Sequence, residues 1–425
     1  MNKVKSLLLL ISVSLIAGAL QAGSFEKDVK SAQGKVKAEA VPEPTIAQAV
    51  AGQSSNKWWS VNFFGSAHRA IIKASLKLID GGLYPDMAAA KDDLKCGAND
   101  ETGHPNDTMN GGDVRGLWEG AAGWTKGGVL QNYQLFKFHE AYERIGAIIH
   151  LTQDQSVPTH VANIKHGISD SFEGFYDNTV RIPSIRFAED LEPYAYYQLL
   201  QDETRSKLPG WTDPATNLPY WVAAPDAPPL GQDATFGPRG HYGGKRNRDV
   251  YAVPPANNFN NSDGNNDNTW TSAHPEIRLQ QLTAAGEATV RVIQAASKRL
   301  PPIIKDLSVT SLTVDAGQTA AMIRFTAFDN RSASLKYMVT IYRGEEKLGV
   351  GATGEFPLEV RDETGIMRKE DVSTAWTGSI NGQRLPPGAY TLEVRLKDTD
   401  GNISPEALSA DPAYPGRTKV AFNLN

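Results

Sequence analysis

The chain has 425 residues, with 43 Lys and Arg against 48 Asp and Glu, and a net charge of −5. A nearly balanced charge argues against a protein held on nucleic acid by a broad basic face, although it leaves room for a local basic groove. The single cysteine, Cys96, rules out an intramolecular disulfide, so the core or bound metal must hold the fold. We expect Cys96 to be a packed thiol rather than a metal ligand or a nucleophile.

The first residues have the pattern of a secretory signal. Lys3 and Lys5 precede an apolar run that ends at Leu20 and is too short to cross a bilayer. We therefore expect residues 1–22 to be a signal peptide and the mature protein to be secreted, either extracellular or periplasmic. Residues 23–57 are polar and rich in Ala, Lys and Glu, which predicts a flexible leader or a propeptide.

Helical periodicity is strongest in residues 58–300, which we interpret as one domain. Apolar residues at helical spacing predict helices over 67–79, 127–153 and 274–298. Pro85 in a first turn predicts a helix over 85–95, and Asp170 as N-cap with Glu173 three residues on predicts one over 170–180. The stretch 181–273 is rich in Pro, Gly, Trp and Tyr and is predicted to be mostly irregular. It forms either the rim of a cleft or a disordered insertion.

After Pro301 and Pro302 the pattern changes to alternating strands separated by turn residues. Strands are predicted at 320–329, 335–344, 388–398 and 418–424. This spacing predicts an antiparallel β-sandwich over 303–425, which we interpret as immunoglobulin-like. We see no clear calcium-binding loop in it.

Histidines and carboxylates are concentrated between Gly146 and Glu173, although the whole chain has only eight histidines. Imidazole and carboxylate are the ligands that Zn²⁺ takes when no thiolate is available. His150 and Asp154 are spaced i, i+4 and project from one face of a helix. Pro158 then interrupts that helix and re-aims His160.

More ligand candidates lie on both sides of this pair. His68 begins the first predicted helix, and Asp100 and His104 follow the second in a Gly-rich loop. His166 and Glu173 come after His160. Taken together, these residue types predict a multinuclear metal site. His139 shares a face of the long helix with His150, but we expect it to form hydrogen bonds rather than to bind metal.

The pattern resembles the zinc-dependent phospholipase C and single-strand nuclease family. The family's mid-chain motif is matched by Gly146, His150, Asp154, Pro158 (one residue earlier than in some members), His160 and Asn163. The opening of the family's first helix is matched by Ala67, His68, Ile71 and Ile72.

The resemblance implies an all-α bundle that holds two or three zinc ions in a cleft. One ion would be held by His150, Asp154, His104 and Asp100, a second by His160, His166 and Glu173, and a third by His68 with Asp154 as the bridging carboxylate. In the family, the third ion also takes an N-terminal Trp. Trp58 has a suitable position only if the chain up to Lys57 is removed.

Two ligand assignments stay open. Asp100 is preferred as the upstream carboxylate, which would also orient or deprotonate the attacking water, but Asp86 and Asp93 are alternatives. The sequence around Glu173 resembles that of the family's glutamate ligand, whereas a spacing of four residues from His166 would select Asp170.

The resemblance implies a secreted zinc-dependent phospholipase C. Its substrate would be a phospholipid membrane surface, with phosphatidylcholine cleaved to diacylglycerol and a phosphorylated head group, and no protein partner is implied. A single-strand nuclease on the same scaffold is the alternative, because the basic loop 239–248 has residues that can follow a phosphate backbone. A third hypothesis is a non-enzymatic surface-binding protein stabilised by metal.

Overall fold

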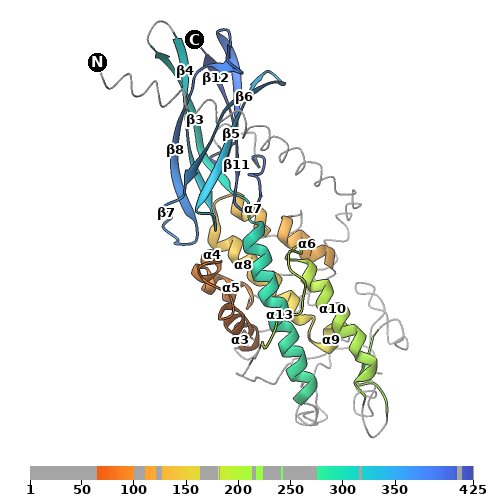
Figure 1. The fold of residues 1–425 in the computed structure, drawn as a ribbon. Coiled ribbons are helices and arrows are strands. Elements are labelled where there is room, and N and C mark those ends of the chain that lie inside the picture. Colours follow the sequence, from red (N-terminus) through yellow and green to blue (C-terminus); the bar gives the residue numbers. More distant parts are fainter. Residues whose placement is uncertain are drawn as a thin grey trace. The chain divides into compact units, whose positions relative to one another are not determined.

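The chain divides into two compact units, with the boundary between Ser297 and Lys298. The computed structural model describes residues 65–99, 111–120, 127–162, 180, 182–212, 217–223, 241–242, 275–314, 318–408 and 414–424. The first unit is helical and the second is built of antiparallel strands (Figure 1). Within the described residues, no helix is both long enough and apolar enough to cross a membrane.

The first unit has nine helices among its described residues. They are α3 (Gly65–Leu76), α4 (Pro85–Ala89), α5 (Lys91–Gly97), α6 (Gly111–Glu119), α7 (Val129–Gln134), α8 (Phe138–Asp154), α9 (Pro158–Val161), α10 (Ala195–Lys207) and α13 (Pro275–Arg299). A 3-10 turn (Leu208–Gly210) follows α10, and a small ribbon pairs β1 (Trp221–Val222) with β2 (His241–Tyr242).

Helix α8 is the centre of this unit. It packs against α5, α6, α7 and α10, and every side chain from Arg144 to Asp154 is buried. A helix that is buried on all sides has neighbours on every face. The residues in its last two turns are therefore held in fixed positions by the surrounding helices.

Two glycines set how closely α5 and α8 cross. A Cβ added at Gly146 would overlap the carbonyl oxygen of Leu94, and one added at Gly97 would overlap that of Glu143. Only glycine allows so close a backbone approach. The crossing also places the end of α5 beside the middle of α8.

Helix α13 is the second buried helix, and all its side chains from Ala284 to Ile293 are buried. Buried polar groups must find hydrogen-bond partners. On α13 they find them on other helices. Gln281 donates to Thr204 of α10 (2.9 Å), Ser297 donates to Asp86 of α4 (2.7 Å), and Ser75 of α3 donates to the Gly286 carbonyl (3.2 Å).

The prediction of one continuous helix over 127–153 is wrong, because α7 ends at Gln134 and a separate helix, α8, begins at Phe138. The amide of Phe136 donates to the carbonyl of Tyr133 at 3.0 Å, and Phe136 itself has a left-handed φ of 59°. This tightened turn breaks the ladder of hydrogen bonds and redirects the chain. The predicted helix 85–95 is likewise divided, at Ala90, into α4 and α5.

The stretch 181–273 was predicted to be mostly irregular, and within its described residues the longest element is α10, whose Tyr196, Tyr197 and Leu200 are buried. The expectation for Cys96 is wrong. Cys96 is exposed near the end of α5 rather than packed. The predicted helix 170–180 lies outside the described residues, apart from Val180.

The second unit has two four-stranded antiparallel sheets. Their strand orders are β12-β11-β5-β6 and β3-β4-β8-β7, and β9 (Ser379–Ile380) pairs with β10 (Gln383–Arg384). The strands of the sheets are β3 (Ile303–Val314), β4 (Gln318–Asp329), β5 (Ser334–Arg343), β6 (Glu346–Pro357), β7 (Val360–Arg361), β8 (Arg368–Trp376), β11 (Gly388–Lys397) and β12 (Lys419–Leu424).

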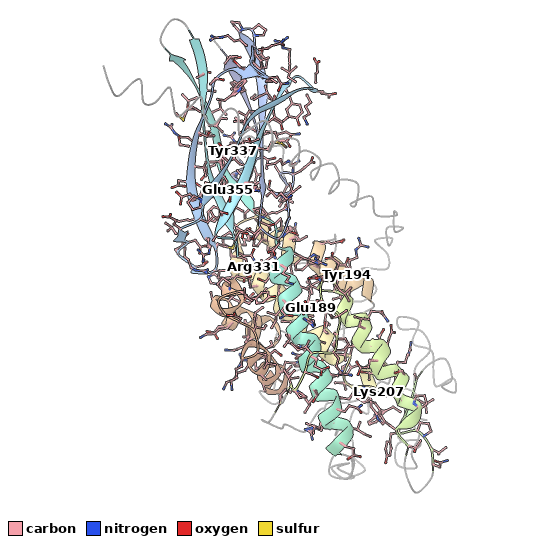
Figure 2. The ribbon with its side chains drawn as sticks, viewed as in Figure 1. Glu189, Tyr194, Lys207, Arg331, Tyr337 and Glu355 are labelled. Carbon is pink, nitrogen blue, oxygen red and sulfur yellow. The ribbon has the colours of Figure 1, made fainter. Side chains whose placement is uncertain are left out.

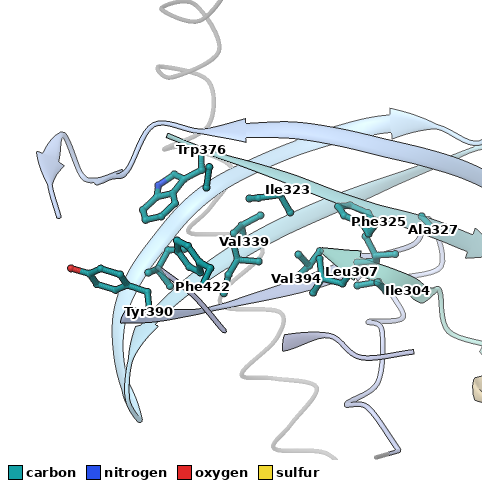
Figure 3. Close-up of a cluster of buried hydrophobic side chains, with 14 of the residues drawn as sticks. Ile304, Leu307, Ile323, Phe325, Ala327, Val339, Trp376, Tyr390, Val394 and Phe422 are labelled. Carbon is teal, nitrogen blue, oxygen red and sulfur yellow. The ribbon is translucent and has the colours of Figure 1, made fainter. Parts of the chain in front are cut away.

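Both sheets contribute side chains to one hydrophobic core (Figure 3). Alternate residues of β4, such as Ile323 and Phe325, meet Val339 of β5 and Val394 of β11 there. The indole of Trp376 is buried and donates a 2.9 Å hydrogen bond to the carbonyl of Ser379. This two-residue alternation is the pattern that predicts strands in a sheet with one buried face.

The four predicted strands coincide with β4, β5, β11 and β12, whereas β3, β6 and β8 had not been predicted. Strand β6 could not be predicted from alternation, because its burial pattern shows no alternation of buried and exposed residues. Figure 2 shows Tyr337 and Glu355 on the neighbouring strands β5 and β6. The antiparallel sheets are found as expected, and the immunoglobulin-like topology stays a prediction.

Candidate metal centre

Three predicted ligands, His68, His150 and Asp154, come together inside the helical unit. Each offers one ligand atom, and these atoms all lie within 4.8 Å of one another. His68 Nε2 is 3.6 Å from Asp154 Oδ1, and His150 Nε2 is 3.2 Å from Asp154 Oδ2. The two imidazole rings lie 4.2 Å apart between centroids, with 33° between their planes.

Two helices provide these side chains. His150 and Asp154 lie one turn apart on α8, and His68 comes from the first half of α3. Both α8 residues are buried, whereas the side chain of His68 keeps 15% exposure. The group therefore opens toward solvent on the side of His68.

The close crossing of α5 and α8 fixes the state of the His150 ring. The carbonyl oxygen of Ala98, just after α5, lies 2.8 Å from His150 Nδ1. A carbonyl can only accept, so Nδ1 carries a proton, and whenever the ring is neutral its lone pair is on Nε2, on the side of Asp154. A ring held in this way is ready to bind a cation.

Asp154 is an ionised carboxylate in a buried place. Its burial acts to raise the pKa, but the positive charge of His150, and then those of His160 and His68, outweigh it and hold the pKa of Asp154 well below its usual range. Its Oδ2 atom is buried and lies 3.2 Å from His150 Nε2, with no other hydrogen-bond donor on it among the described residues.

A zinc ion fits this donor set. Zn²⁺ is commonly bound by imidazole nitrogens and a carboxylate oxygen, and three protein ligands leave a position open for water or substrate. Here two Nε2 atoms converge on a carboxylate whose buried Oδ2 has no donor other than His150 among the described residues. Zinc bound by His68, His150 and Asp154 would satisfy that atom and balance the buried charge.

His160 lies close to this group without being one of its three members. It is the third residue of α9, which begins at Pro158, and its side chain is half-buried. Its charge contributes to lowering the pKa of Asp154. Pro158 was expected to interrupt the helix of His150 and Asp154, but α8 already ends at Asp154 and Pro158 is the first residue of α9. Helix α9 carries His160 to within electrostatic reach of the carboxylate.

Four of the predicted ligands cannot be placed. Asp100, with its predicted catalytic role, and His104, His166 and Glu173 lie outside the described residues, as do the alternative ligands Trp58 and Asp170.

The other two alternatives, Asp86 and Asp93, are engaged elsewhere. Asp86 accepts hydrogen bonds from Tyr142 at 2.7 Å and from Ser297 at 2.7 Å. Asp93 lies 2.9 Å from Nδ1 of His139, in line with the expectation that His139 forms hydrogen bonds. Neither carboxylate belongs to the group formed by His68, His150 and Asp154.

Two partners of the ligands were missed in the sequence. Ala98 acts through its backbone carbonyl, so its side chain gives no signal. Gln153, whose Oε1 lies 2.6 Å from His68 Nδ1, is adjacent to Asp154 in the motif. It does not belong to the zinc-ligand residue types, and for that reason it was overlooked.

Comparisons with known proteins do not assign the chain to a family. No family model matches it, and no curated protein sequence matches it. Among solved structures, alpha-toxin from an avian strain of Clostridium perfringens is 9% identical, covers 86% of this chain and 98% of its own, and has a TM-score of 0.27. The alkylpurine DNA glycosylase AlkC of Pseudomonas fluorescens is 12% identical, covers 86% and 96%, and has a TM-score of 0.17. At these scores neither likeness carries an argument about this chain.

Proposed function

We propose that the chain is a zinc-dependent phosphodiester hydrolase that acts as a secreted phospholipase C. Its proposed substrate is the phosphodiester of glycerophospholipids, above all phosphatidylcholine, and its products are diacylglycerol and a phosphorylated head group. The observation that carries the proposal is the convergence of His68, His150 and Asp154 within 4.8 Å. The motif that these residues share with zinc-dependent phospholipases supports the choice of reaction.

The residues of the site have separate tasks in this proposal. A bound zinc ion supplies a Lewis acid for the phosphoryl oxygens and activates water. His150 and His68 would hold such an ion through their Nε2 atoms, and Asp154 would supply the negative charge that balances it in a buried place. The side of the group nearest His68 is the more exposed, so it is the side from which a phosphodiester can approach.

The remaining ligands follow from the family resemblance. His160, with His166 and Glu173, is proposed to hold a second ion, and Asp100 and His104 to complete the site around His150. A third ion would need Trp58 as the first residue of the mature chain.

The proposal is tested with the purified mature protein on two substrates in parallel. Phosphatidylcholine vesicles report release of diacylglycerol, and single-stranded DNA reports nuclease activity, each with and without chelator. We expect chelator-sensitive release of diacylglycerol alone, and a loss of at least about 100-fold in His150→Ala, because even an outer partner of a zinc ligand contributes up to that much.

His139→Ala is the matched control, since His139 lies on the same helix and pairs at the surface with Asp93. It should retain full activity and metal content. Cleavage of DNA alone would instead support the nuclease alternative. Metal binding without hydrolysis of either substrate, in a chain that begins at Trp58, would contradict an enzymatic function.

A further inference from the structure

A chain of hydrogen bonds connects α13 to His68. The hydroxyl of Thr289 donates to the carbonyl of Ala285 at 2.7 Å, and Gln153 Nε2 donates to Thr289 Oγ1 at 2.9 Å. The other end of the Gln153 amide, Oε1, lies 2.6 Å from His68 Nδ1. Gln153 is 1% exposed and Thr289 is fully buried, so water does not compete for these bonds.

The direction of each bond follows from the number of protons available. Thr289 has one hydroxyl proton and gives it to Ala285, so toward Gln153 it can only accept. The amide must then turn its NH₂ group to Thr289 and its oxygen to His68. An amide oxygen has no proton to give, and His68 Nδ1 is therefore the donor.

The consequence is felt on the other nitrogen of the ring. With the proton on Nδ1, neutral His68 has a lone pair on Nε2, the atom that lies 3.6 Å from Asp154 Oδ1. If the amide turned over, its NH₂ group would face Nδ1 and the proton would move to Nε2. That tautomer of His68 cannot bind a cation on the side of Asp154.

We propose that Gln153 and Thr289 are positioning residues that select the metal-binding tautomer of His68. Their effect on zinc rests on the proposed function, but their effect on the tautomer does not. His150 needs no such device, because its Nδ1 faces a backbone carbonyl that cannot turn over. His68 is thus the ligand whose state depends on a side chain, and Thr289 on α13 keeps that side chain in the correct orientation.

The test replaces Thr289 and reads His68 directly. Thr289→Val keeps the shape but removes the hydroxyl, which frees the amide of Gln153 to turn over, whereas Thr289→Ser keeps the hydroxyl. The tautomer is read from the ¹⁵N shifts of the His68 ring in the metal-free full chain, at an alkaline pH where the ring is neutral. Zinc affinity is measured by competition with a chelating dye.

We expect the Nδ1–H tautomer in wild type and in Thr289→Ser, and a large population of Nε2–H in Thr289→Val. Zinc affinity should fall about 10- to 100-fold in Thr289→Val, the usual range for an outer partner of a metal ligand. An unchanged tautomer in a folded Thr289→Val, or an equal loss of affinity in the valine and serine variants, would overturn the proposal.

A second variant separates this effect from simple damage to the fold. Gln153→Glu has two oxygens and no N–H to present, so combining it with Thr289→Val should restore the Nδ1–H tautomer. If the double variant stays in the Nε2–H form, the amide is not the cause. If the tautomers behave as expected but wild type binds no zinc, the proposed function fails and the role of Gln153 stands.

Discussion

Asp154, Asp329 and Asp398 are all buried carboxylates, yet their surroundings move their pKa values in opposite directions. Imidazole charges around Asp154 lower its pKa despite burial. Burial raises the pKa of Asp329 to about 6, helped by the charge of Asp400, and backbone N–H groups of Ser332 and Arg331 only partly offset it. Burial and then the charge of Asp329 raise the pKa of Asp398 to about 7. The residue type alone cannot predict such differences.

The raised pair makes the β-sheet unit sensitive to pH. Asp329 stays protonated in the folded chain up to about pH 6, whereas the unfolded residue loses its proton near 3.8. The folded unit is therefore stabilised by the protonated carboxyl groups, fully so below pH 3.8. This stabilisation is lost as the pH rises through about 6 for Asp329 and through about 7 for Asp398. For Asp329 it amounts to roughly 3 kcal/mol. We expect the free energy of unfolding of this unit to fall over that interval and Asp329→Asn to remove much of the fall.

The slowest-exchanging amides of β4 and β11 measure that free energy. At alkaline pH, Asp329→Asn should be the more stable protein, since it removes a buried charge. Glu355→Gln is the matched control, because Glu355 is exposed on β6 of the same unit and accepts its bond from Ser334. A pH dependence equal in wild type and in Asp329→Asn would contradict the expectation.

Among the elements, long helices and alternating strands could be predicted and their interruptions could not. The periodicity that predicts 274–298 and the second half of 127–153 belongs to α13 and α8, which bury most of their surface. The break at Phe136 depends on a left-handed residue that is not glycine, so the sequence carries no signal for it. Strand β6 lacks an alternating face and is invisible to a pattern of period two.

In the candidate site, too, some residues could be predicted from the sequence and others could not. The ligand types and the i, i+4 spacing on α8 predicted His150 and Asp154. His68 was a candidate from its residue type and its place in the first predicted helix, and the resemblance gave it a role as ligand. The hydrogen-bond partners could not be predicted, since Ala98 acts through its backbone and Thr289 lies 136 residues from Gln153. Long-range contacts of this kind are decided by packing, on which a local pattern gives no information.

The crossing of α5 and α8 leads to a prediction at Gly146. In Gly146→Ala the new methyl group would overlap the carbonyl of Leu94, so the helices must separate. We expect a loss of about 1–3 kcal/mol in the free energy of unfolding. We also expect weaker zinc binding, because the carbonyl of Ala98 would move away from His150.

Urea unfolding and zinc competition check the two effects. Gly210→Ala serves as control, since a Cβ there would meet nothing within 4 Å. Wild-type stability in Gly146→Ala would mean that the two helices do not need their close approach.

For the whole molecule, the division into two units predicts separate responses. The group of His68, His150 and Asp154 lies in the helical unit, and the two carboxyl groups with raised pKa, Asp329 and Asp398, lie in the β-sheet unit. A ligand stabilises only the unit that binds it, by about 2.7 kcal/mol at 100 times its dissociation constant. Zinc should therefore slow the most protected amides of α8 about 100-fold and leave those of β4 and β11 unchanged.

Amide hydrogen exchange with and without zinc, at constant pH, distinguishes the two units in one experiment. Equal slowing in both would show that they open together, contrary to this expectation. His150→Ala provides the baseline, because it should show no slowing in either unit.

The late place of α13 in the chain has a consequence for biosynthesis. His68, His150 and Asp154 leave the ribosome well before Thr289 does, so a nascent chain holds the three ligands long before the hydroxyl that orients Gln153 exists. Until α13 has been made and buried, His68 is free to take either tautomer. If the chain binds zinc as proposed, ordered capture of the ion would then be one of the last events in the maturation of the helical unit, after translation has passed this helix.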